Sequence, residues 1–128
     1  CEDVDLNWRA QLAGYKCVFA PRAVIYHHLS ATGGGEIASF YTGRNTLWVL
    51  AKDYPGQLLR RYWRSVVSAQ LKIARDAFKA QQGAAARARL RGQLAGLLGL
   101  PRWLGKRRAV QAKQRVSSEV IEQLLTKE

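Results

Sequence analysis

Apolar and polar positions follow different patterns in the first part of the chain. Over residues 3–13 apolar side chains recur at every fourth position, and Gly14 follows, so this pattern predicts a short helix that ends at the glycine. Two runs rich in β-branched and aromatic residues, 17–20 and 23–26, are separated by a Pro-Arg break and predict two short strands. Residues 29–36, with three consecutive glycines, follow neither pattern and predict a mobile loop.

The rest of the chain has the spacing of helices. Residues 37–54 place their aromatic side chains near one face, and Pro55-Gly56 ends that helix. Residues 57–82 predict an amphipathic helix with Trp, Tyr, Phe and Val on one side and Arg and Lys on another. A further helix is expected after Gly83 and is expected to stop at Pro101.

The last helix is expected to be short and to begin near two serines. Either Ser117 or Ser118 could cap it, because a serine hydroxyl accepts a hydrogen bond from the free backbone N–H groups of a first helical turn. The pattern alone does not choose between them.

Charge divides the chain into two parts. The net charge is +12, but residues 1–56 hold five basic and five acidic residues, so the whole excess lies in residues 57–128. We therefore expect a front part, 1–56, and a basic helical tail, 57–128. The sequence has no apolar run long enough for a membrane span, and its only cysteines, Cys1 and Cys17, do not form a disulfide framework or a zinc site, which favours a cytoplasmic setting.

Three carboxylates stand at the start of the first predicted helix. Glu2, Asp3 and Asp5 lie where free N–H groups and the positive end of the helix dipole stabilise negative charge. An ordinary capping cluster and a catalytic cluster would share this pattern. The local pattern leaves both interpretations open.

The order of residues around this cluster resembles family 2 glycosyltransferases of the inverting type, in particular bacterial rhamnosyltransferase-like members. The match covers residues 1–56 and extends loosely into the tail. It consists of Glu2-Asp3-Val4-Asp5-Leu6, Arg9, Leu12-Ala13-Gly14-Tyr15, Pro21, Ala23-Val24 and Tyr26-His27-His28. The resemblance implies the C-terminal part of an α/β fold of the GT-A type, followed by amphipathic helices.

The implied activity is that of a hexosyltransferase. It would move a glycosyl group from a nucleotide sugar to the hydroxyl of a sugar or lipid-linked glycan, with inversion, in cell-envelope polysaccharide or glycolipid synthesis. Because residues 1–128 contain no donor-binding half with its DxD motif, the resemblance also implies a fragment that is inactive alone and requires the missing N-terminal half of the same domain.

The resemblance assigns roles to individual residues. Asp3 takes the place of the general base, and Glu2 and Asp5 the places of acceptor-binding or supporting acids. Arg9 would hold the acidic cluster in place, although at four residues from Asp5 it could equally form a surface ion pair.

A metal ion is implied as well. His27 falls where the family carries a histidine that ligates a divalent cation, Mg²⁺ or Mn²⁺. His28 is a neighbouring or alternative ligand, and Arg44 could contact an acceptor or a diphosphate or simply lie on the helix surface.

The basic tail has three possible partners. Its amphipathic helix has the profile of an interfacial helix that binds anionic lipid, which would place the protein peripherally at the inner face of the bacterial cell membrane. The same helix could instead pack on the front part. The alternative from another class is a basic helical module that binds nucleic acid or serves as an adaptor without catalysis, but no nucleic-acid motif accompanies the arginines, and nucleic-acid binding is not expected.

Overall fold

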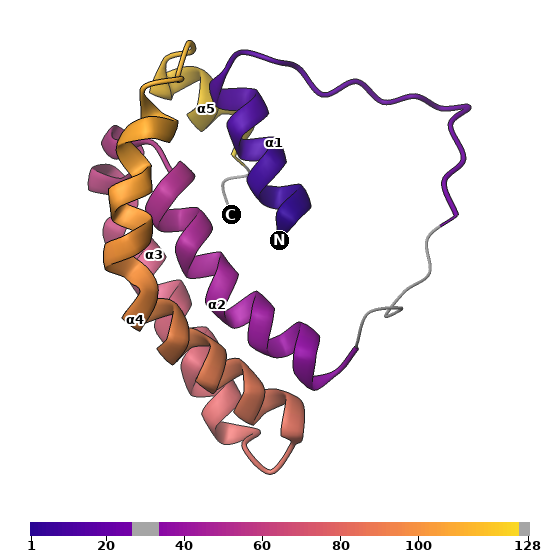
Figure 1. The fold of residues 1–128 in the computed structure, drawn as a ribbon, viewed down its shortest axis with the longest axis vertical. Coiled ribbons are helices and arrows are strands. Elements are labelled where there is room, and N and C mark those ends of the chain that lie inside the picture. The colour runs from indigo at the N-terminus through magenta and orange to yellow at the C-terminus, as the bar shows by residue number, and fades with distance from the viewer. Residues whose placement is uncertain (27–33, 126–128) are drawn as a thin grey trace.

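The computed structural model describes residues 1–26 and 34–125, and within them every regular element is a helix (Figure 1). The helices are α1 (Glu2–Leu12), α2 (Glu36–Asp53), α3 (Gly56–Lys79), α4 (Ala84–Gln111) and α5 (Ser118–Leu124). The expected α/β fold of the GT-A type is therefore wrong for the part of the chain that the structure describes, which is a small helical bundle.

The two predicted strands are the elements that fail. Residues 15–26 leave the bundle as an extended excursion between α1 and the start of α2 (Figure 1), and their apolar side chains are exposed, Phe19 by 85%. The N–H of Ala23 donates to the carbonyl of Ala20 at 3.0 Å, which forms a turn around Pro21. A strand requires a second backbone to pair with. No described segment lies in register beside these residues, so their β-branched pattern forms no ladder.

The mobile loop expected over residues 29–36 falls mainly on residues 29–33, which lie outside the described residues. Within the rest, Gly35 adopts a φ of 62° immediately before α2, and Glu36 is the first residue of that helix.

The closest packing in the bundle is that of α2 against α4 (Figure 1). One side of α4 carries glycines where it meets α2, at Gly92, Gly96 and Gly99. A Cβ atom on Gly92 would collide with the carbonyl oxygen of Phe40, and one on Gly96 would lie 2.8 Å from Cδ1 of Leu47. The missing side chains allow the two helix backbones to approach each other closely. This contact joins α2, which belongs to the front part (1–56), to α4, which belongs to the basic tail (57–128), so the basic tail packs on the front part.

Helix α4 does not stop at Pro101, contrary to the sequence prediction, and continues to Gln111. Beyond the proline, Trp103 stacks on Trp48 of α2 with ring centroids 4.9 Å apart, and Arg107 donates to the carbonyl of Ala51 at 2.8 Å. These tertiary contacts offset the local cost of a proline inside a helix.

The apolar core lies where the remaining helices meet the C-terminal end of α2. Its buried members are Leu12, Tyr54, Leu58 and Ile121, from α1, the end of α2, α3 and α5. Arg61 and Tyr62 of α3 both bind the carboxylate of Glu122 in α5, which holds the last helix against the core.

Several helix ends agree with the sequence prediction. Gly14, with a φ of 88°, follows α1, and Pro55-Gly56 separates α2 from α3. The cap of α5 is Ser117 rather than Ser118, since the N–H of Val120 donates to the Ser117 hydroxyl at 3.4 Å.

Helix α3 buries only part of its apolar side against the other helices. The residues of this side that remain exposed recur at helical spacing and form what we call the α3 stripe, Trp63, Val67, Leu71 and Phe78. Exposed cations of the same helix lie beside it, Arg60, Arg64, Lys72, Arg75 and Lys79.

None of the helices in residues 1–26 and 34–125 combines the length and the apolar character needed to cross a membrane.

Candidate functional site

The acidic cluster occupies the first turn of α1, as the sequence predicts, but its three carboxylates have different surroundings. The side chain of Asp3 is 83% exposed, and its Oδ1 accepts a hydrogen bond from the N–H of Val4 at 2.8 Å. Glu2 is also exposed. Asp5 is half-buried and faces α2.

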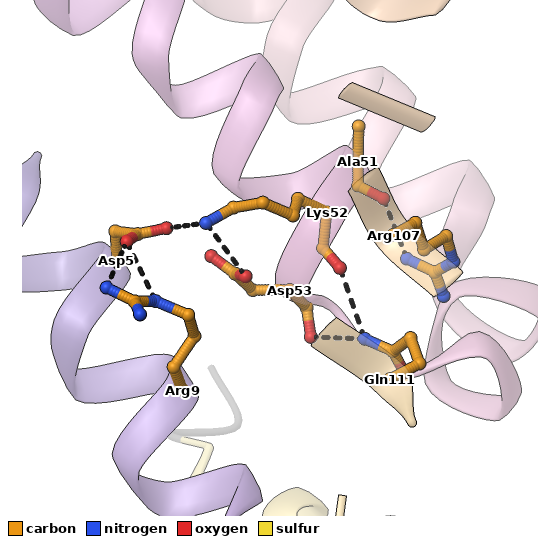
Figure 2. A network of polar contacts seen from close by, with 7 residues as sticks. All are labelled: Asp5, Arg9, Ala51, Lys52, Asp53, Arg107 and Gln111. Atoms are coloured by element: carbon orange, nitrogen blue, oxygen red, sulfur yellow. Dashed lines mark hydrogen bonds and ion pairs between the residues drawn. The ribbon is translucent and has the colours of Figure 1, made fainter. Parts of the chain in front are cut away.

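Asp5 joins α1 to the end of α2 (Figure 2). Its Oδ2 accepts from Arg9 at 2.9 Å, so the ion pair weighed for Arg9 is present, and its Oδ1 pairs with the ammonium of Lys52. Burial raises the pKa of Asp5, but hydrogen bonds from Lys52 and Asp53 and the charges of Lys52 and Arg9 outweigh it, and the pKa of Asp5 is lowered. Asp5 is therefore a structural anion of this contact.

Asp53 is a second, fully buried carboxylate beside the same lysine. Its Oδ1 lies 3.3 Å from Nζ of Lys52, but neither of its carboxylate oxygens accepts a well-formed hydrogen bond. Burial, together with the neighbouring Asp5 carboxyl, raises the pKa of Asp53 from 3.8 to about 7, against the opposing charge of Lys52. Near neutral pH this site holds one ammonium between two carboxyl groups, of which one carries a proton for part of the time.

Two side chains of α4 bind the end of α2 (Figure 2). Gln111 donates to the carbonyls of Lys52 and Asp53 at 3.2 and 3.0 Å, and Arg107 donates to that of Ala51. These carbonyls have no partner within their own helix, and a cation at a helix C-terminus also favours the dipole. Sequence reasoning missed this cluster. Its signal was the Lys-Asp pair in the last turn before Pro55-Gly56.

A cleft of about 590 Å³ lies between α1, α2 and α4. Four of the predicted site residues line it together with side chains from the tail. The residues that matter for its chemistry are Glu2, Asp5, Arg9, Arg44, Lys52, Trp48, Trp103 and Lys106. Asp3 stands on the same helical turn but does not line this cleft.

Two stacked aromatic rings with a cation over each of them form one wall of the cleft. The guanidinium of Arg44 lies 4.2 Å from the ring centroid of Trp48, and the indole of Trp48 stacks on that of Trp103. The ammonium of Lys106 lies 4.5 Å from the Trp103 ring. The sequence pattern placed Trp48 on an apolar helix face and gave no sign of its pairing with Trp103.

The predicted metal site cannot be placed on the structure. His27 and His28 lie outside the described residues. Within residues 1–26 and 34–125 no group of three or more His, Cys, Asp or Glu side chains is arranged to hold a metal ion. The described carboxylates of α1 therefore do not by themselves fit the Mg²⁺ or Mn²⁺ that the resemblance implies.

No protein-family model, no curated protein and no solved structure matches this chain.

Proposed function

We propose that this chain belongs to a glycosyltransferase that moves a glycosyl group from a nucleotide sugar to a hydroxyl acceptor, with inversion, in cell-envelope polysaccharide or glycolipid synthesis. The exposed carboxylate of Asp3 carries this proposal, because it stands on the first turn of α1 beside a cleft of cations and indoles. Carboxylates, cations and aromatic ring faces are the groups that recognise phosphorylated sugars. The ordered resemblance over residues 1–56 supports the same reaction.

Asp3 is the general base in this proposal. It removes the proton from the acceptor hydroxyl while that oxygen forms a bond to the anomeric carbon of the donor. The bond from the anomeric carbon to the donor phosphate breaks, and the nucleoside diphosphate leaves with the electron pair. Asp5 and Arg9 hold the α1 turn against Lys52, which fixes the position of Asp3.

The test uses the complete gene product, since the resemblance implies that donor binding requires a further part of the protein. Transfer from UDP-glucose and dTDP-rhamnose to a lipid extract is measured for the natural protein, for Asp3→Asn and for Asp76→Asn. Asp76 is an exposed acid of α3, so its variant matches the chemical change away from the cleft.

We expect Asp3→Asn to lower turnover by about a hundredfold or more with donor binding retained, and Asp76→Asn to behave like the natural protein. Equal turnover in all three proteins contradicts the role of Asp3. A natural protein that transfers no sugar from either donor contradicts the transferase proposal.

Helix α3 supports a peripheral location at the inner face of the bacterial membrane. The α3 stripe exposes apolar side chains beside five cations, and each cation near an anionic lipid surface contributes about 1 kcal/mol. A Trp, Val, Leu and Phe stripe beside such cations is the arrangement of interfacial helices. Nucleic acid would also attract the cations of α3, but the apolar side chains of the α3 stripe would then stay exposed to water.

Sedimentation with vesicles tests this location. We expect binding to vesicles of phosphatidylglycerol and phosphatidylcholine, weaker binding to phosphatidylcholine alone, and no retention by duplex DNA at physiological salt. Leu71→Ser should weaken vesicle binding by about tenfold, because a buried leucine contributes roughly 1.5 kcal/mol or more. Leu6→Ser is the matched control, since Leu6 of α1 is 61% exposed and Leu71 64%. Retention by DNA but not by vesicles would support the nucleic-acid alternative.

A further inference from the structure

Helices α3 and α4 form an antiparallel hairpin (Figure 1), and one hydrogen bond marks the line along which they meet. Nε2 of Gln93 in α4 donates to the backbone carbonyl of Gln70 in α3 at 3.2 Å. Partly buried residues of α3 follow the same line at helical spacing, Val66, Ala74 and Ala77. The other sides of both helices can be located by rotation from this line of contact.

The α3 stripe lies on the same face of the hairpin as exposed leucines of α4. Each residue of a helix is rotated by about 100° from the residue before it. Because the two helices are antiparallel, rotation in the same sense away from the line of contact leads to the same face of the pair. Leu71 follows Gln70 and Leu94 follows Gln93, so these two leucines lie on one face.

We call this surface the hairpin face. It consists of the α3 stripe and of four leucines of α4, Leu94, Leu97, Leu98 and Leu104. All of its residues are rotated by about 20° to 140° from the line of contact, and their exposed fractions run from 46% for Val67 to 76% for Leu98. Gly92 precedes Gln93 and is therefore turned to the opposite side, where it meets the backbone of Phe40 in α2. Helix α2 thus lies behind the hairpin, and the hairpin face is left open.

The outer edges of the hairpin face are basic. Further rotation in the same sense reaches exposed arginines on both helices, Arg75 at about 140° from Gln70 and Arg102 at about 180° from Gln93. Helices α3 and α4 contain one acidic residue, Asp76, and it is rotated by about 240°, to the side of α3 that is turned away. An apolar surface with cations at both outer edges and no carboxylate of its own helices complements an anionic lipid surface.

We propose that the hairpin face docks on an anionic lipid bilayer, with α3 and α4 both lying flat on it and α2 on the side that faces water. The apolar side chains enter the boundary between headgroups and acyl chains, and the arginines meet the lipid phosphates. A second copy of the chain on the same face would bring two sets of arginines together, which like-charge repulsion opposes. The inference rests on the peripheral location proposed above, and adds to it the part of α4 and the orientation of the bundle.

Vesicle sedimentation of the α4 variants tests the proposal. Binding of the chain to vesicles of phosphatidylglycerol and phosphatidylcholine is measured for the natural protein, Leu94→Ser and Leu98→Ser, and far-UV circular dichroism establishes that each variant is folded. Leu6→Ser is the control, since Leu6 of α1 is 61% exposed and Leu94 59%. We expect each α4 variant to weaken binding by about tenfold, and Leu6→Ser to change it by less than about twofold.

The possible failures can be told apart. If Leu71→Ser weakens binding and both α4 variants bind like the natural protein, α3 docks alone, so the inference is overturned and the peripheral location stands. If the natural protein does not bind these vesicles, both fail. An equal loss in Leu6→Ser overturns the inference, because binding would then not depend on the hairpin face. A dimer in analytical ultracentrifugation that Leu98→Ser dissociates also overturns it, because a second copy would occupy the face.

Tryptophan quenching by lipids with brominated acyl chains tests the orientation. Trp63 lies on the hairpin face, whereas Trp48 and Trp103 stack on each other between α2 and α4, and Trp8 packs against Tyr54. We expect the brominated vesicles to quench part of the fluorescence of the natural protein and to leave that of Trp63→Phe unchanged. Equal quenching of Trp63→Phe and the natural protein would overturn the proposed orientation.

Discussion

Gly92 is the position where the packing of α2 on α4 can be tested most directly. A Cβ atom there would overlap the carbonyl oxygen of Phe40 and lie 2.9 Å from its carbonyl carbon. Both are backbone atoms of α2, so no side-chain rotation relieves the clash and the helices must separate. Overpacking of this kind costs typically 1–3 kcal/mol, and loss of the interhelical contact adds to it. The higher helix propensity of alanine returns about 1 kcal/mol. We therefore expect Gly92→Ala to lower the free energy of unfolding by about 2 kcal/mol.

Gly105→Ala is the matched control on the same helix. Nothing lies within 4 Å of the Cβ atom that this change adds, so only helix propensity should act, and the variant should be stabilised by about 0.5–1 kcal/mol. Urea unfolding followed by far-UV circular dichroism measures both variants. Midpoints that move in opposite directions support the close contact. If both variants were stabilised to the same extent, the backbones of α2 and α4 would not meet at Gly92 and the described packing would be wrong.

Three further changes test other parts of the structure. The raised pKa of Asp53 means that the stability contributed by its proton is present below pH 3.8 and lost as the pH rises to about 7. At pH 8 the free energy of unfolding of Asp53→Asn should therefore exceed that of the natural protein, by at most about 4 kcal/mol. Urea titrations should show this difference shrinking toward pH 4. A difference that does not change with pH would refute the ionisation of a buried Asp53. Ser117→Ala should lower the free energy of unfolding by about 1 kcal/mol, because the hydrogen bond from the N–H of Val120 is lost. Thermal unfolding measures this change, and an unchanged Tm would show that Ser117 does not cap α5. Leu58→Ala should lower the free energy of unfolding by about 2–5 kcal/mol because Leu58 is buried in the core. A change within experimental error would show that Leu58 is not part of the core.

The sequence predicted most of the helix ends because their causes are local. Gly14 ends α1, Pro55 separates α2 from α3, and a serine begins α5, each through the conformation or hydrogen bonding of a few neighbouring residues. The ion pair between Asp5 and Arg9 was within reach for the same reason, since four residues span one helical turn.

The failures concern interactions between distant segments. The β-branched pattern of residues 17–26 expresses a local preference for extended backbone, but a strand forms only where another backbone pairs with it. Pro101 predicted a helix end, and contacts of Trp103 with α2 override it.

In the candidate site, too, local features could be predicted and contacts between distant segments could not. The sequence predicted site roles for Glu2, Asp3, Asp5 and Arg9 from the α1 motif, and for Arg44 from the residues that follow. All of them except Asp3 line the cleft. It could not show that Lys106, in the basic tail, lines the same cleft. That placement depends on the packing of α4, which depends in turn on small residues whose partners are unknown until the helices are assembled.

The contact between α2 and α4 also limits how the chain can be divided. A cut after residue 56 follows the change in charge and would look natural to anyone designing a shorter protein. It would, however, strip α2 of the helix that covers Leu47 and Trp48, and it would remove the side chains that bind its last carbonyls. The front piece would then present bare apolar surface and unpaired polar backbone to water, so the acidic turn of α1 can be studied in its folded setting only with the tail attached.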